Sequence, residues 1–231
     1  MDLFWRLILA HLLADFTLQT DYIASWKRKN MAGGLAHSLV FFVCGAALCF
    51  GQLGDPWVVF GHSLPVSIWV ALAALTFFHF LEDEWRVQTI KRASSKDSLL
   101  FFFVDQGVHV ALIFLFFPPL AAQSPEKWVA LAILLVLTTH FTSIFIYFIE
   151  KQLRGSSELV ASERYNSMAE RLVTGLLLLL PGAWALISAA WLGLVFFRWF
   201  KNKQAVPALN MAIGNSLAVL FGIMARAVFY S

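Results

Sequence analysis

Charge is scarce in this sequence, because only 13% of its 231 residues are Asp, Glu, Lys or Arg while 60% are hydrophobic. A water-soluble domain keeps about a quarter of its residues charged, so the composition excludes an ordinary soluble domain and indicates an integral membrane protein. The formal net charge of +3 comes from Lys and Arg in short joints between apolar runs. Without a continuous basic face, the sequence gives no support for binding nucleic acid.

Cysteine is nearly absent, and several familiar catalytic motifs are missing. Cys44 and Cys49 lie five residues apart in one apolar run, so they do not share a helical face, and we expect free buried thiols rather than a disulfide framework. The sequence has no Walker phosphate loop, no Gly-x-Ser-x-Gly elbow and no His-Glu-x-x-His zinc helix. Serine-based hydrolysis therefore has no positive support.

Long apolar runs are what the sequence does contain. A helix needs roughly 20 apolar residues to cross a bilayer, and about seven segments approach that length. They are Leu3–Thr20, Leu35–Leu53, Leu64–Leu81, Leu99–Phe117, Trp128–Ile149, Leu172–Phe197 and Val206–Tyr230. Since no low-complexity linker divides them, we expect one integral-membrane domain over residues 1–231, an all-α polytopic bundle of about six or seven helices. Its motif-bearing half is residues 1–117, and further helices occupy residues 128–231.

Basic residues alternate between the joints. They concentrate in the first, third and fifth joints, whereas the second and fourth together carry only Lys127. By the positive-inside rule, the odd joints are cytoplasmic and the N-terminus lies on the far side. Arg198, Lys201 and Lys203 after the sixth run break this alternation. That run contains Pro181-Gly182, which predicts either a re-entrant helical hairpin that returns to the cytoplasm or a single kinked span.

Ionisable residues interrupt four of the apolar segments, although each costs at least about 2.5 kcal/mol inside a membrane. The stretches HLLAD, HFLED and DQGVH each place a His and an Asp four residues apart, on one helical face. The predicted topology brings these pairs, and one more histidine in the second segment, to one depth in the cytoplasmic half. The residues concerned are His11, Asp15, His37, His79, Asp83, Asp105 and His109.

Imidazole and carboxylate groups are the usual ligands of zinc, manganese, iron and nickel, and a bridging carboxylate permits two ions. One His–Asp pair alone is readily explained by a hydrogen bond within the bundle. Three pairs and His37 at one depth instead favour a shared site for one or two divalent metal ions, or for shared protons. All seven residues are candidate metal ligands, and Asp15, Asp83 and Asp105 are also candidate catalytic bases.

The remaining polar residues are expected to form hydrogen bonds or to face solvent, and none of them is a candidate metal ligand. Gln19 and Gln106 lie near the pairs and could hydrogen-bond a ligand or water. Glu82 and Glu84 flank Asp83 and are expected to face headgroups and solvent. A solvated joint position is expected for His62, and interhelical hydrogen bonding for His140.

The stretches HLLADFTLQTDYIASWKRKN, HFLED and DQGVH, together with His37, resemble a family of bacterial inner-membrane proteins known only as a domain of unknown function. The resemblance covers Leu3 to Val110, and its strongest motif is the opening His-x-x-x-Asp-Phe-x-Leu-Gln. In the family, a Lys commonly follows the His and Asp of the third segment, whereas here Trp85 and Arg86 follow Glu84. The resemblance implies a multi-pass protein of the bacterial inner membrane, and it implies no activity.

The leading functional expectation is a membrane-embedded, metal-dependent hydrolase acting on a membrane lipid or another amphipathic substrate. A bound metal would lower the pKa of water to about 7 and polarise an ester or phosphoryl oxygen. A looser similarity of plan links the His and Asp residues to bacterial inner-membrane proteins described as metal-dependent hydrolases. Lys27, Arg28 and Lys29 could hold an anionic headgroup.

Two alternatives remain open. A transporter or channel for a metal ion or protons would use the same residues and predicts polar positions that continue to the opposite face. Few such positions occur in the outer halves of the first four segments, which favours the hydrolase. The third possibility is a non-enzymatic membrane component whose polar cluster fixes helix packing for a partner protein.

Overall fold

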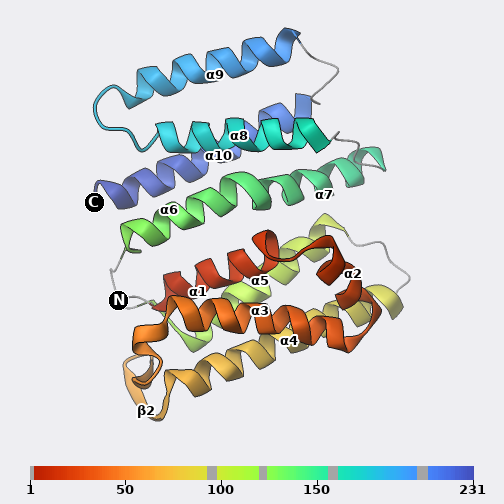
Figure 1. Cartoon of the computed structure of the whole chain (residues 1–231), viewed down its shortest axis with the longest axis vertical. Helices are drawn as coiled ribbons and strands as arrows, with labels where there is room; N and C mark the ends of the chain where they lie inside the picture. The colour runs from red at the N-terminus through yellow and green to blue at the C-terminus, as the bar shows by residue number, and fades with distance from the viewer. Residues whose placement is uncertain (1–2, 93–97, 120–123, 156–160, 202–207) are drawn as a thin grey trace. The chain divides into compact units, whose positions relative to one another are not determined.

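A computed structural model describes residues 3–92, 98–119, 124–155, 161–201 and 208–231. Helices account for most of this described chain, as the sequence predicts, with a short antiparallel hairpin of β1 (Pro56–Val59) and β2 (His62–Ser67) as the exception (Figure 1). The chain forms two compact units, Met1–Glu126 and Lys127–Ser231. The expectation of one domain stays a prediction.

Five helical stretches are long and apolar enough to cross a membrane. They are Met31–Leu48, Leu99–Phe116, Lys127–Leu153, Trp184–Lys201 and Ala208–Phe229. Large apolar side chains on their surfaces are exposed, among them Leu39, Phe103 and Leu194, as lipid-facing positions require. The chain is therefore a membrane protein, as its composition predicts.

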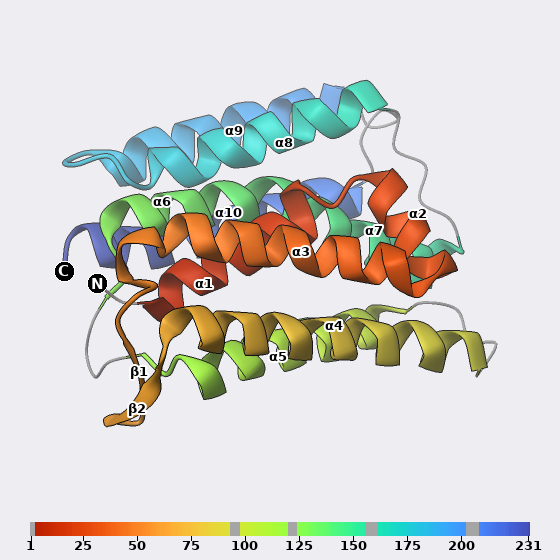
Figure 2. The same ribbon diagram turned by 60° about the horizontal axis from the view of Figure 1, so that its bottom comes forward.

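The first unit is a helical bundle in which four helices surround a shared interior, and we call these four helices the ring. Its helical elements are α1 (Leu3–Leu12), the π-helical turn η1 (Leu13–Thr17), α2 (Asp21–Lys29), α3 (Met31–Leu48), the 3-10 turn η2 (Phe50–Gln52), α4 (Ile68–Arg92) and α5 (Leu99–Phe116). The helix α1 packs against α3 and α5, and α4 packs against the same two helices (Figures 1 and 2). The helix of the third apolar segment begins at Ile68 rather than Leu64, because residues 62–67 form the strand β2. At its other end the helix continues past the predicted end at Leu81, to Arg92.

The ring is apolar at one end and polar at the other. Its hydrophobic core includes Leu7, Phe41, Leu72 and Ile113 and extends to Leu53 beside the β-hairpin. The His and Asp residues singled out in the sequence lie further along the same four helices, toward the end that carries α2 (Figure 2). The interior of the first unit is therefore closely packed and apolar near the β-hairpin, and it contains ionisable side chains near α2.

A tight corner joins α2 to α3. The side chain of Asn30 caps α3 by accepting a hydrogen bond from the backbone N–H of Gly33 at 3.1 Å. At Gly33 a Cβ atom would lie 2.3 Å from the backbone carbon of Trp26, so only glycine permits this approach. The corner holds α2 against the start of α3.

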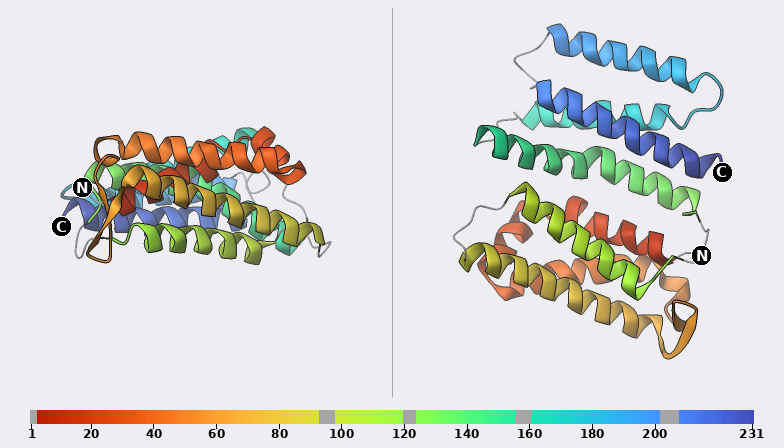
Figure 3. Two further views of the ribbon diagram at one scale, coloured as in Figure 1. Left: turned by 90° about the horizontal axis from the view of Figure 1, so that it is seen from below. Right: turned by 180° about the vertical axis from the view of Figure 1, so that it is seen from behind.

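The second unit contains a long helix and three shorter ones. The long helix is continuous through α6 (Lys127–Val136), the π-helical turn η3 (Leu137–Phe141) and α7 (Thr142–Arg154); the others are α8 (Ala161–Leu177), α9 (Trp184–Lys201) and α10 (Ala208–Phe229). The helix α10 packs against α6, α7 and α8, and α9 packs against α8 (Figure 3). The predicted start of the seventh segment at Val206 lies outside the described residues.

The sixth apolar run is two antiparallel helices rather than one kinked span. The chain reverses between α8 and α9, where Pro181 lacks a backbone donor and Gly182 adopts a positive φ of 65° (Figure 3). Arg226 caps the end of α8 by donating from Nη1 to the carbonyl oxygens of Leu178 and Leu180, at 2.9 and 2.7 Å. The predicted helical hairpin is therefore correct and the single kinked span is wrong, while re-entry stays a prediction.

Candidate metal centre

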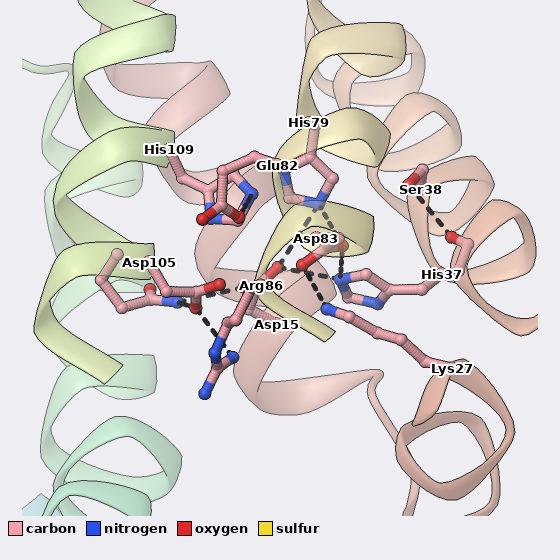
Figure 4. Close-up of polar contacts among 12 residues, drawn as sticks. Asp15, Lys27, His37, Ser38, His79, Glu82, Asp83, Arg86, Asp105 and His109 are labelled. Atoms are coloured by element: carbon pink, nitrogen blue, oxygen red, sulfur yellow. Dashed lines mark hydrogen bonds and ion pairs between the residues drawn. The ribbon is translucent and has the colours of Figure 1, made fainter. Parts of the chain in front are cut away.

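Four helices of the first unit bring all seven predicted ligands into one buried cluster, and Figure 4 labels them except for His11. The helix α1 and its π-helical extension supply His11 and Asp15, α3 supplies His37, α4 supplies His79 and Asp83, and α5 supplies Asp105 and His109. None of these residues is more than 7% exposed. We call them the His/Asp cluster.

The backbone at Asp15 is unusual. Asp15 lies in η1, where Leu18 donates its backbone N–H to the carbonyl oxygen of Leu13 at 2.8 Å, five residues back. Such π-helical turns within α-helices are rare and frequent at functional sites. Here the turn sets the direction in which the Asp15 carboxylate leaves its helix.

Four donor atoms of the His/Asp cluster lie close together, with each of two carboxylate oxygens beside the same two imidazole nitrogens. Asp15 Oδ1 lies 3.3 Å from His37 Nε2 and 3.8 Å from His79 Nε2. Asp83 Oδ2 lies 3.5 Å from His37 Nε2 and 3.7 Å from His79 Nε2. Among the residues that the structure describes, none of these four buried atoms has a hydrogen-bond partner. We call this group the four-donor centre.

These separations suit a metal ion. The edge of a tetrahedron is about 1.6 times its centre-to-corner distance, so donors bound at about 2.0–2.2 Å lie about 3.3–3.6 Å apart. The four carboxylate-to-imidazole distances, 3.3 to 3.8 Å, are close to that expectation, and the donor atoms of Asp15, His37 and His79 all lie within 4.8 Å of one another. Buried polar atoms without partners are rare in folded proteins, and a cation shared by Asp15, His37 and His79 would satisfy three of the four, with Asp83 Oδ2 adjacent to both imidazoles.

The second oxygen of each carboxylate in the four-donor centre is held from outside it. Asp83 Oδ1 accepts a buried charge-assisted hydrogen bond from Lys27 on α2, and Asp15 Oδ2 accepts one from Gln106 Nε2 at 3.2 Å (Figure 4). Burial lowers the pKa of Lys27, but the carboxylates of Asp83, Asp15 and Asp105 outweigh burial and raise it overall. Lys27 is therefore a cation, and both carboxylates are oriented with one oxygen free.

Gln106 also fixes the orientation of His11. Its amide nitrogen donates to Asp15 and to Asp105, the latter at 2.9 Å, so its oxygen faces His11 Nε2 at 3.1 Å. His11 Nε2 consequently carries the proton and donates it. In a neutral imidazole this leaves the lone pair on Nδ1, 3.5 Å from Asp15 Oδ1, as a further free donor for a metal.

A second group of donors adjoins the first around His109. His109 Nε2 lies 3.2 Å from Glu82 Oε2. His109 can also share an ion with Asp15 and Asp105, or with His11 and His79, because ligand atoms of each trio lie within 4.8 Å of one another. Asp105 is held by Arg86, whose Nη1 lies 3.2 Å from Asp105 Oδ2.

Charge balance indicates how much positive charge the interior still requires. The carboxylates of Asp15, Asp83 and Asp105 carry three negative charges when ionised, Glu82 adds a fourth if it is ionised too, and Lys27 and Arg86 supply two positive charges. With all imidazoles neutral, one negative charge remains when Glu82 is protonated and two remain when it is ionised. A divalent cation can compensate this charge, as can protons on the histidines, so the interior is suited to a metal ion or to protons.

Two sequence interpretations are wrong at this site. Glu82 does not face headgroups or solvent, because it is 7% exposed and pairs with His109. Lys27 is also buried and is bound to Asp83, so it is not free to hold a headgroup. Glu84 is half-buried and accepts a hydrogen bond from Gln88.

The sequence did contain a signal for Glu82 and Arg86, the two residues of α4 that contact the cluster and were not predicted to do so. His79, Glu82, Asp83 and Arg86 follow the spacing i, i+3, i+4, i+7, which places all four on one helical face. Lys27 gave no comparable signal, because its position depends on the corner at Gly33.

The other polar predictions have mixed outcomes. Gln106 bonds to cluster residues, whereas Gln19 Oε1 is buried without a partner among the described residues. His62 is exposed in β2, as expected for a solvated position. His140 bonds through Nδ1 to Thr139 at 3.1 Å in the second unit, so the interhelical role stays a prediction. Cys44 and Cys49 are free, as predicted.

The helical membrane fold and this buried site define the class of the chain, a polytopic membrane protein with a candidate metal centre. Residues 3–135 match the family described as "Protein of unknown function (DUF3307)", and the chain belongs to that family. The match contains every residue of the His/Asp cluster, together with Lys27 and Gln106. The comparisons with curated proteins and with solved structures gave no match.

Proposed function

We propose that the protein is a membrane-embedded, metal-dependent hydrolase that acts on a lipid or another amphipathic substrate. The observation that carries the proposal is the four-donor centre, in which two unpartnered carboxylate oxygens each lie 3.3 to 3.8 Å from two unpartnered imidazole nitrogens, and in which the donors of Asp15, His37 and His79 form one group. Its imidazole and carboxylate donors suit zinc, manganese, iron or nickel. The charge balance of the interior supports one divalent ion, and the adjoining donors around His109 leave room for a second.

Each residue then has a distinct task. Asp15, His37, His79 and Asp83 hold the ion, while Lys27 and Gln106 orient the two carboxylates. When bound, a divalent cation acts as a Lewis acid that makes water acidic near neutral pH and polarises a carbonyl or phosphoryl oxygen. Asp105 is not among the four ligands, and its Oδ1 has no hydrogen-bond partner among the described residues, so we assign it the role of the base that accepts a proton.

The substrate class follows from depth. The His/Asp cluster lies inside a ring of apolar helices, at the end where α2 carries exposed Arg28 and Lys29. A substrate with an apolar part reaches such a site from within the leaflet. With the positive-inside rule, we place this end at the cytoplasmic leaflet of a bacterial inner membrane and the N-terminus on the far side.

Metal content tests the proposal directly. Purified protein, stripped with a chelator and reloaded with zinc, manganese, iron or nickel, is analysed by plasma mass spectrometry after removal of unbound ions. The wild type should retain about one ion per chain, and His37→Ala should lose it. His62→Ala is the matched control, because His62 is exposed in β2, and should retain the ion. Loss in neither variant, or no retention by the wild type, would remove the basis for the hydrolase.

Complete burial of the His/Asp cluster favours a second candidate, a transporter for a metal ion or protons, because transported ions pass through occluded sites. Against it, the hairpin end of the same ring is filled by apolar side chains such as Leu7, Leu72 and Ile113. Proteoliposomes distinguish the two when an entrapped metal- or pH-sensitive dye is combined with labelled phospholipid and ester-lipid analogues. The hydrolase predicts product formation without flux, abolished in Asp105→Asn, whereas flux without product would establish the transporter.

A further inference from the structure

The second unit contains a buried arginine with spare hydrogen-bond donors. Arg171 on α8 is 2% exposed. Its Nη2 donates to Ser143 Oγ at 2.6 Å, but its Nε and Nη1 have no partner among the described residues. A buried guanidinium with two unused donors is costly unless an anion completes its hydrogen bonds.

The fold makes room for this side chain. A Cβ atom at position 214 of α10 would lie 2.9 Å from Arg171 Cδ, so Gly214 creates the space through which the arginine extends. Arg171 therefore reaches a pocket between α8, α9 and α10, lined also by Ser167, Glu170, Arg198 and Asn210.

The lining of this pocket carries one uncompensated positive charge. Arg198 Nε pairs with Glu170 Oε1 at 2.5 Å, which leaves the charge of Arg171 unmatched there. The hydroxyl of Ser167 is buried and also lacks a partner within the described part of the chain. Arg171 and Ser167, which both line the pocket, thus offer two guanidinium N–H groups and a hydroxyl without partners among the described residues, which is the donor set of an oxyanion site.

The position of the pocket identifies the source of the anion. Arg198 and Trp199 lie near the end of the membrane-span candidate α9, and Asn210 lies near the start of the next one, α10. The end of α9 and the start of α10 lie at the same end of the second unit (Figure 1). The pocket is consequently at an end of two candidate membrane spans, which is where lipid headgroups lie and where tryptophan is enriched. The basic residues Arg198 and Lys201 mark this end as the one facing the anionic leaflet.

We propose that this pocket binds the phosphodiester group of an anionic membrane phospholipid through Arg171 and Ser167. A phosphodiester carries a single negative charge, which matches the charge missing from the pocket. Its two free oxygens suit the fork of Nε and Nη1, and its acyl chains can lie along the exposed apolar surfaces of α9 and α10. The proposal does not depend on the metal centre of the first unit.

The test uses the full chain, purified in dodecyl maltoside without added lipid. Its melting temperature is measured with short-chain phosphatidylglycerol, short-chain phosphatidylcholine and inorganic phosphate at equal concentrations, and native mass spectrometry counts bound lipid. The wild type should be stabilised most by phosphatidylglycerol and should carry it as a discrete adduct. Arg171→Gln should lose both effects, while Arg92→Gln, which removes an exposed arginine from the end of α4, should keep them.

Two further observations keep the test decisive. Because Arg171→Gln removes an uncompensated buried charge, it should melt no lower than the wild type without lipid. Arg171→Lys retains the charge but loses the fork, so it should bind phosphatidylglycerol roughly 10–100-fold more weakly. Retained stabilisation of Arg171→Gln by phosphatidylglycerol would overturn the site, and equal stabilisation of the wild type by inorganic phosphate would overturn the lipid as its ligand.

Discussion

Replacing Lys27 with methionine measures how far the interior of the first unit depends on a charge supplied by α2. The Lys27 side chain is 9% exposed and that of Asp83 is 0% exposed, so solvent barely screens the pair. Exposed ion pairs contribute about 0.2–1 kcal/mol, whereas removal of one member of a buried pair costs about 3–5 kcal/mol because the other charge is left unpaired. We therefore expect Lys27→Met to lower the free energy of unfolding of the metal-free protein by about 3–5 kcal/mol.

The assay is equilibrium unfolding in mixed micelles of dodecyl maltoside and sodium dodecyl sulfate, followed by circular dichroism. Lys29→Met is the matched control, because Lys29 is exposed on the same helix, and it should change the stability by less than about 0.5 kcal/mol. Adding Asp83→Asn to Lys27→Met should recover most of the loss, since no unpaired charge then remains. A cost for Lys27→Met equal to that of the control, or no recovery in the double variant, would refute the assignment.

Other substitutions probe the supports of the site. Gln106→Leu should weaken metal binding about 10–100-fold in a chelator competition titration, because it releases the Asp15 carboxylate; Gln88→Leu, outside the cluster, should not. Gly33→Ala should destabilise the first unit by about 1–3 kcal/mol in the micelle assay, because it forces α2 away from α3. Gly107→Ala meets nothing within 4 Å and should be neutral or slightly stabilising. Asn30→Ala should cost about 1 kcal/mol by uncapping α3, with metal stoichiometry unchanged. Equal effects within either matched pair would contradict these expectations.

The sequence was sufficient to predict the helical membrane fold and the convergence of the His and Asp residues. Both predictions depend on patterns that a bilayer enforces, because a span needs a long apolar run and an ionisable residue within it needs a partner. The charge pattern of the joints gave a reversal at Pro181-Gly182 as one of two alternatives, and the pairing of Glu170 with Arg198 reflects that reversal.

What the sequence did not disclose depends on contacts between distant segments. In the sequence, Lys27 is one of three consecutive basic residues in a joint between apolar runs, which suggests a solvated position. In the fold, the close packing at Gly33 holds the helix of Lys27 where its side chain reaches Asp83. The predicted apolar run Leu64–Leu81 takes in the last four residues of the strand His62–Ser67, because an alternating segment of a few residues can be either strand or helix. Glu82 and Glu84 both flank Asp83 in the sequence, and the prediction that both face headgroups and solvent is wrong for Glu82. The two residues lie on different faces of α4, so Glu82 is buried whereas Glu84 is half-buried.

Burial of the four-donor centre would also govern how quickly a bound ion is exchanged. Its residues are at most 7% exposed, so an ion held there leaves only when the surrounding helices separate. Release then occurs at the rate of a conformational opening, and a chelator in solution removes the ion at a rate that stops rising with chelator concentration. The identity of an ion bound at this centre would therefore be set mainly by the ions present when the chain folds. The fraction of chains that hold an ion would respond only slowly to later changes in the ion concentration.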